Sequence, residues 1–124
     1  MNQRALVADD SGPMRAIVVR NLKSIGVEEI VEAADGAEAL KLFRSSVFTV
    51  VITDYNMPLM NGLDLVKGIR ASGSRVPILM LTTEAERSTV VAAIQAGVSS
   101  YLIKPFDSSL LKKKLEKLWN VQPV

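Results

Sequence analysis

Val50-Val51-Ile52-Thr53-Asp54 is a short apolar run that ends at a carboxylate, and it is the strongest indication of fold in the chain. Nearly continuous apolar runs of this length are typical of strands that are buried on both faces of a parallel sheet. The same pattern recurs on both sides of this stretch, with a polar or charged side chain after each run. The other runs and their followers are Ala5–Ala8 with Asp9 and Asp10, Ile78–Leu81 with Thr82, and Tyr101–Ile103 with Lys104.

Strand-like and helix-like segments alternate along the whole chain. Strands are expected near Ala5–Ala8, Glu29–Ala33, Val50–Thr53, Pro77–Leu81 and Ser100–Ile103. Apolar residues recur at helical spacing between them, and the expected helices carry Met14 to Ile25, follow a cap at Asp35, begin near Gly62, run from about Glu86 to Ala96, and follow a cap at Asp107. In the fourth helix, Val90, Val91 and Ile94 are expected to face inward. Strict alternation predicts an α/β fold: a flavodoxin-like, doubly wound, five-stranded parallel sheet in the order 2-1-3-4-5, with helices on both faces.

Composition limits the function classes. The 124 residues fit one domain spanning 1–124, and a net charge of +2 gives no reason to expect nucleic-acid binding. No apolar stretch approaches the roughly 20 residues of a membrane span, and no signal peptide is recognisable, so a cytoplasmic protein without membrane contact is expected. The absence of cysteine and histidine leaves oxygen as the ligand atom for any metal, which favours Mg²⁺, Mn²⁺ or Ca²⁺.

The carboxylates should meet at one edge of the sheet. In open parallel sheets the binding site lies beyond the carboxyl ends of the strands, where the strand order reverses. In the expected order, that reversal brings Asp9 and Asp10 beside Asp54. Clustered carboxylates repel one another unless a cation binds or one is protonated. A bound Mg²⁺ would let Asp54 act as a nucleophile toward a phosphoryl group, with Lys104 neutralising charge and Thr82 donating a hydrogen bond.

Several motifs in fixed order carry a family resemblance that spans Leu6 to Leu118. They are Val7-Ala8-Asp9-Asp10 with Met14-Arg15, Thr53-Asp54-Tyr55-Asn56-Met57-Pro58 with Asn61-Gly62, Leu81-Thr82-Thr83-Glu84-Ala85, Ala93-Ile94-Gln95-Ala96-Gly97, and Tyr101-Leu102-Ile103-Lys104-Pro105-Phe106. With these motifs the chain resembles a receiver domain of bacterial two-component response regulators, most closely those of chemotaxis. Any one motif alone would be a weak signal.

The resemblance implies a role for each matching residue. Asp54 would accept the phosphoryl group, while Asp9, Asp10, Asp54 and the backbone carbonyl of Asn56 would hold Mg²⁺ or Mn²⁺. Lys104 would pair with the phosphoryl group, and the peptide bond between Lys104 and Pro105 would be cis. Thr82 and Tyr101 would form a switch that couples the site to the surface of the fourth helix, fifth strand and fifth helix.

The resemblance also implies partners and a mode of action. A sensor histidine kinase would donate the phosphoryl group, and a flagellar motor switch protein or another downstream protein would read the signal; a phosphatase is a further candidate partner. The chain would be a monomeric signalling protein that promotes only its own phosphorylation and dephosphorylation. Three positions depart from the family pattern: Thr83 stands where alanine or glycine is common, Tyr55 where the closest relatives have tryptophan, and Asn61 where aspartate is common. Asparagine also caps helices, so little change is expected at Asn61.

Other interpretations stay open at this point. The chain could be a phosphorelay intermediate, or a receiver excised from a larger regulator. An Mg²⁺-dependent phosphatase of the aspartyl-phosphate type is less favoured, because no Asp-x-Asp pair follows the first strand. Nucleotide or flavin binding is disfavoured because no glycine-rich phosphate loop follows that strand.

Overall fold

The computed structural model describes residues 3–120, which form five strands and five helices in strict alternation. Their bounds are β1 (Arg4–Ala8), α1 (Gly12–Ser24), β2 (Glu29–Ala33), α2 (Gly36–Ser45), β3 (Val50–Thr53), α3 (Gly62–Ala71), β4 (Ile78–Thr82), α4 (Arg87–Ala96), β5 (Ser100–Ile103) and α5 (Ser108–Asn120). Each element lies close to where the sequence predicted it. Among the described residues, no helix combines the length and the apolar character that crossing a bilayer requires.

The five strands form one parallel sheet in the order β2-β1-β3-β4-β5. The strand order reverses at β1, which pairs with β2 on one side and with β3 on the other. Its last residue, Ala8, stands opposite Ala33 of β2 and Thr53 of β3. The predicted fold class and strand order are therefore confirmed.

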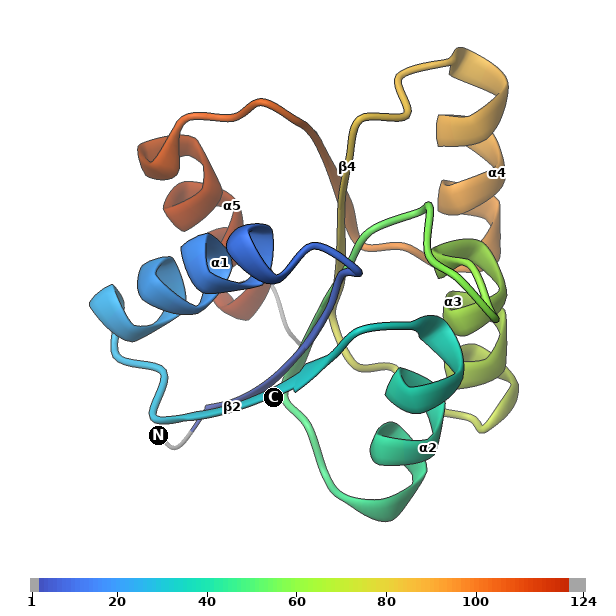
Figure 1. Cartoon of the computed structure of the whole chain (residues 1–124), viewed down its shortest axis with the longest axis horizontal. Coiled ribbons are helices and arrows are strands. Elements are labelled where there is room, and N and C mark those ends of the chain that lie inside the picture. The colour runs from blue at the N-terminus through green and yellow to red at the C-terminus, as the bar shows by residue number, and fades with distance from the viewer. Residues whose placement is uncertain (1–2, 121–124) are drawn as a thin grey trace.

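Helices cover both faces of this sheet (Figure 1), with α1 and α5 on one side and α2, α3 and α4 on the other. A hydrophobic core lies on each face of the sheet, and successive residues of each buried strand point alternately into one core and the other. Leu6 and Ala8 point to the core under α2, α3 and α4, whereas Ala5 and Val7 point to the core under α1 and α5. A strand buried on both faces must be apolar at every position, which explains the continuous apolar runs.

Side-chain caps fix where several helices begin. The Asp35 side chain accepts a hydrogen bond from the N–H of Glu38, and the Glu38 side chain accepts one from the N–H of Ala34, which is a reciprocal capping arrangement. Asn61 caps α3 by accepting from the N–H of Asp64 at 2.8 Å. The asparagine at this position therefore keeps the capping function that its sequence predicted.

The inward face of α4 differs from the prediction. Val91 and Ile94 are exposed, and Ile94 is 58% exposed, whereas the buried residue of the helix is Ala93. Val90 is half-buried. The larger apolar side chains suggested the wrong face of α4. The helix packs through the small Ala93, which lets it approach closely. Two apolar side chains are thereby left on the outer face of α4.

Leu59, in the loop between β3 and α3, has an unusual backbone. Its φ angle is 67°, and its side chain is 86% exposed. The left-handed region costs an L-residue with a Cβ about 1–2 kcal/mol, although asparagine visits it readily. Leu59 therefore combines backbone strain with little compensating burial.

We expect Leu59→Asn to raise the free energy of unfolding by about 1 kcal/mol, because asparagine tolerates this φ angle better. Urea denaturation measures the change. Leu59→Ala is the matched control, since it removes the exposed apolar side chain but keeps the strain. A gain of equal size in both variants would show that exposure, rather than strain, is the cost.

Candidate functional site

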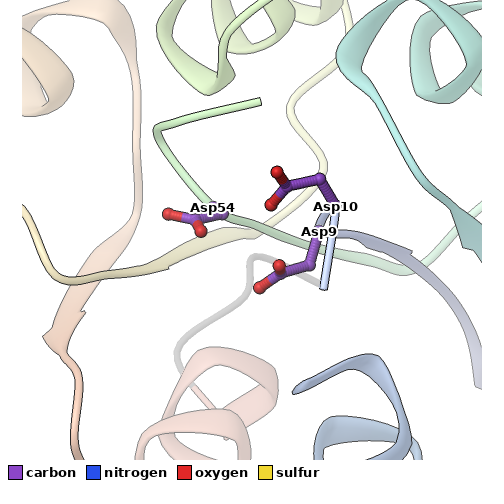
Figure 2. Close-up of side chains that lie close together, drawn as sticks. All are labelled: Asp9, Asp10 and Asp54. Carbon is purple, nitrogen blue, oxygen red and sulfur yellow. The ribbon is translucent and has the colours of Figure 1, made fainter. Parts of the chain in front are cut away.

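Three carboxylates meet where β1 and β3 end. Asp9 and Asp10 directly follow β1, and Asp54 directly follows β3, which is the neighbouring strand in the sheet. One ligand oxygen from each carboxylate lies within 4.8 Å of the others, and Figure 2 shows the three side chains gathered in one place. Asp9 is buried, whereas Asp10 is exposed. The reversal of strand order thus produces the cluster that the sequence predicted.

Lys104 bridges two of these carboxylates from the end of β5. Its ammonium group lies 2.8 Å from Oδ2 of Asp9 and 3.1 Å from Oδ2 of Asp54. The backbone N–H of Lys104 donates to the carbonyl of Thr82 at 2.8 Å, and the Lys104–Pro105 peptide bond is cis. The structure thus brings residues from four strand ends to one site.

Burial and ion pairing act in opposite directions on Lys104, whose side chain is only 10% exposed. Burial lowers the pKa of the ammonium group, but the hydrogen bonds and charges of Asp9 and Asp54 outweigh it and raise the pKa above its usual range. The lysine therefore stays charged. One cation faces three carboxylates, and within residues 3–120 the Asp10 side chain makes no hydrogen bond or ion pair.

The loop after β3 packs tightly over Asp54. Oδ1 of Asp54 accepts a hydrogen bond from the N–H of Tyr55 at 2.6 Å, and the N–H of Gly62 donates to the carbonyl of Tyr55 at 2.7 Å. A Cβ atom on Gly62 would lie 2.0 Å from the Asp54 carbonyl oxygen, so only glycine fits here. The glycine at the start of α3 thus lets the loop hold the carboxylate of Asp54 in place.

Asp9 is fixed by contacts on every side. Its N–H donates to the carbonyl of Ala33, and Oδ1 accepts from the N–H of Ser11 at 2.9 Å. Its backbone carbonyl accepts a hydrogen bond from Nη1 of Arg15 at 2.6 Å. Sequence reasoning assigned no role to Arg15, because nothing in the residue order shows that a side chain on α1 reaches back to the end of β1.

The remaining predicted residues lie around the end of β4. Thr82 is fully buried, and its hydroxyl accepts a hydrogen bond from the N–H of Glu84 at 3.3 Å. The Tyr101 hydroxyl donates to the carbonyl of Glu84 at 2.7 Å, while its ring packs against the core. Asn56 donates from its side chain to Oε1 of Glu84 at 2.9 Å. Glu84 therefore links the loop after β3 to Tyr101.

The donor set fits a hard divalent cation. Every candidate ligand is an oxygen, and the carboxylates carry more negative charge than Lys104 balances. Mg²⁺ prefers such oxygens and needs only one or two carboxylates in addition to water and phosphate. The exposed carboxylate of Asp10 leaves the cluster open to an incoming ion.

The pKa of Tyr101 is raised by burial and by the negative charges of Glu84, Tyr55 and Asp54. The chain has two tyrosines, so Tyr55→Phe isolates Tyr101. In that variant, the midpoint of the phenolate absorbance titration of the folded protein should lie above pH 10.0, which is the ordinary pKa of tyrosine. Because the folded pKa exceeds the unfolded one, the stabilising contribution is complete below the unfolded pKa and is lost as pH rises through the folded pKa.

The titration has an internal reference, because the same variant in concentrated urea reports the unfolded tyrosine. Circular dichroism confirms that the protein without urea stays folded through the measured range. Identical titration curves in the two conditions would contradict a half-buried Tyr101 beside acidic groups.

Comparison with known proteins gives a consistent result. The chain matches the family described as "response regulator receiver domain" over residues 5–116. It is 47% identical over 116 residues to chemotaxis protein CheY1 of Helicobacter pylori, which covers 91% of this chain and 94% of that protein. It is 43% identical over 120 residues to chemotaxis protein CheY-3 of Vibrio cholerae, with 95% and 92% covered.

Comparison of the structure with solved structures agrees with the sequence comparison. The solved structure of the chemotaxis response regulator CheY4 of Vibrio cholerae matches this one with a TM-score of 0.88 at 37% identity, covering 95% of this chain and 99% of that chain. The family match spans nearly all of the described residues. This chain belongs to the response regulator receiver domain family.

Proposed function

We propose that this chain is a phosphoryl-accepting chemotaxis signalling protein in which Asp54 is the acceptor. The ion pair between Lys104 and Asp54, beside two further carboxylates, is the observation that carries the proposal. Its relatives at 43% to 47% identity are chemotaxis proteins. The chain acts in the cytoplasm as a single receiver domain of residues 1–124 and as a monomer, and its output is a change in protein binding.

Asp9, Asp10, Asp54 and the backbone carbonyl of Asn56 are the proposed ligands of Mg²⁺, with Mn²⁺ as a substitute. When bound, the cation neutralises negative charge on the transferring phosphoryl group and fixes its orientation. Asp10 is the most exposed of the three carboxylates and has the fewest competing contacts, so it is available to the incoming ion. Asp9 already shares its Oδ2 with Lys104.

The chain's own residues perform the transfer step. A carboxylate oxygen of Asp54 attacks the phosphorus of a phosphohistidine on a sensor kinase, and the bond from phosphorus to the histidine nitrogen breaks. The N–H of Tyr55 holds Oδ1 of Asp54, which orients the nucleophile. Lys104 moves its ammonium contact from Asp54 to a phosphoryl oxygen, and Thr82 donates its hydroxyl hydrogen to another.

The output surface lies on α4, β5 and α5. Four large apolar side chains are exposed there: Val91, Ile94, Ile103 and Leu110. A shift of Thr82 toward the phosphoryl group would disturb its contact with the N–H of Glu84, and Glu84 also holds the Tyr101 hydroxyl. We propose that this link transmits phosphorylation to the surface, where a flagellar motor switch protein or another downstream protein binds. A phosphatase ends the signal.

Intact-protein mass spectrometry after incubation with acetyl phosphate tests the acceptor role. Wild-type protein in Mg²⁺ is expected to gain one phosphoryl group, because Asp54 is positioned and the cation supplies the missing positive charge. EDTA, Asp54→Asn and Asp10→Asn should each abolish or strongly reduce the adduct. Beryllofluoride, which mimics the acyl phosphate, should bind wild type and fail to bind Asp54→Asn.

The controls separate receiver chemistry from other activities. Circular dichroism of each variant shows that loss of the adduct is not loss of folding. An adduct that persists in Asp54→Asn would show that another residue is the acceptor. Sustained release of phosphate from small phosphomonoesters, with many turnovers for each protein molecule, would instead support the phosphatase alternative.

A further inference from the structure

We propose that Arg15 is a positioning residue for the metal site: its guanidinium group holds the Asp9–Asp10 peptide so that the Asp10 carboxylate faces the incoming cation. The inference rests on the proposed function, because it concerns the same Mg²⁺ site. Arg15 is not a candidate ligand and is not a catalytic residue. It acts through the backbone of the loop that carries Asp9 and Asp10.

The guanidinium group makes two hydrogen bonds in different directions. Nη1 donates to the backbone carbonyl of Asp9 at 2.6 Å, and Nε donates to Oε1 of Glu32 at 3.0 Å. The Arg15 side chain is 21% exposed, so much of it is removed from water. The planar fork of arginine fixes the angle between its donors. Glu32 on β2 therefore holds Arg15, and Arg15 holds the carbonyl of Asp9.

The Asp9 carbonyl lies just past the point where β1 ends. The N–H of Asp9 still bonds to Ala33 in the manner of the sheet, but the Asp9 carbonyl takes its hydrogen bond from a side chain instead. That carbonyl belongs to the peptide unit whose nitrogen is that of Asp10. Because peptide units are planar, fixing this oxygen also fixes the direction in which the chain enters Asp10.

Asp10 depends on its backbone more than the other two carboxylates do. Asp9 and Asp54 are held by Lys104 and by the backbone N–H groups of Ser11 and Tyr55. Within residues 3–120, the Asp10 side chain makes no such contact. Its direction is therefore set mainly by the peptide unit that Arg15 holds.

Electrostatics alone predicts the opposite effect of Arg15 on Mg²⁺ affinity. A positive charge near a cation site repels the cation, so removal of Arg15 would strengthen Mg²⁺ binding if charge were the dominant effect. The ion pair with Glu32 offsets that charge. We therefore expect the positioning effect to dominate and removal of Arg15 to weaken Mg²⁺ binding.

The test is an Mg²⁺ titration of metal-free wild type and Arg15→Met, followed by NMR of the backbone amides from Asp9 to Ser11. Arg15→Met is expected to raise the Kd for Mg²⁺ roughly tenfold, a size typical for the loss of a group that orients a metal ligand. Before any metal is added, the Asp10 amide resonance should already shift. At saturating Mg²⁺, phosphorylation by acetyl phosphate should return close to the wild-type rate.

Two matched variants identify the cause. Glu32→Gln keeps an acceptor oxygen for Arg15 but removes the charge that offsets the guanidinium group, so it isolates the charge effect, and Mg²⁺ affinity should fall by less than in Arg15→Met. Arg15→Lys keeps the positive charge but not the fork, so its affinity should fall between those of Arg15→Met and wild type. Equal or tighter Mg²⁺ binding in Arg15→Met would overturn the inference.

The outcomes also separate this inference from the proposed function. If wild-type protein shows no Mg²⁺ binding that depends on Asp10 and Asp54, the proposed function fails. If wild type binds Mg²⁺ but Arg15→Met binds it equally well, only the role of Arg15 fails. If Arg15→Met binds weakly and its phosphorylation stays slow at saturating Mg²⁺, Arg15 acts on the transfer step, and a role restricted to metal positioning is wrong.

Discussion

The ammonium group of Lys104 organises the site, because it contacts the carboxylates of both Asp9 and Asp54. Asp9 and Asp54 are largely removed from water, and two carboxylates side by side repel each other unless a cation lies between them. Lys104 satisfies both at 2.8 Å and 3.1 Å. It leaves Asp10 unbalanced, so the site retains net negative charge. That residual charge is what would allow the proposed divalent cation to bind beside a permanent lysine.

The sheet makes this arrangement possible with few special features. Reversal of the strand order places β1 between β2 and β3, so the residues that follow β1 and β3 must lie side by side. β4 and β5 then bring Thr82 and Lys104 to the same edge. The helices bury the continuous apolar runs from both faces. Side chains beyond the strand ends are left free to carry out chemistry, because the cores below them supply the stability.

Features that follow from the spacing of apolar residues, or from the order of strands and helices, could be predicted from the sequence. The strand order, the cap at Asn61 and the gathering of Asp9, Asp10 and Asp54 follow from apolar runs, cap residues and topology. The buried stripe of α4 was predicted wrongly, because side-chain size suggested Ile94 where packing requires the small Ala93. A contact between two elements is harder to predict than the elements themselves.

Arg15 and Leu59 show why. The hydrogen bond from Arg15 to the Asp9 carbonyl depends on how α1 sits on the sheet, and no pattern in the residues encodes that angle. The left-handed backbone of Leu59 lies beside Met60, whose carbonyl packs against Gly36 at the start of α2, and leucine itself does not indicate such a turn. Both features depend on tertiary geometry rather than on local preference.

A double-mutant cycle between Lys104→Met and Asp9→Asn tests the central interaction most directly. The free energy of unfolding of wild type, both single variants and the double variant is measured by urea denaturation in EDTA, so that no divalent cation contributes. If Lys104 holds the carboxylates together, the coupling energy should favour the wild-type pair by about 1 kcal/mol or more. Additive effects, with a coupling energy near zero, would contradict this view of the site.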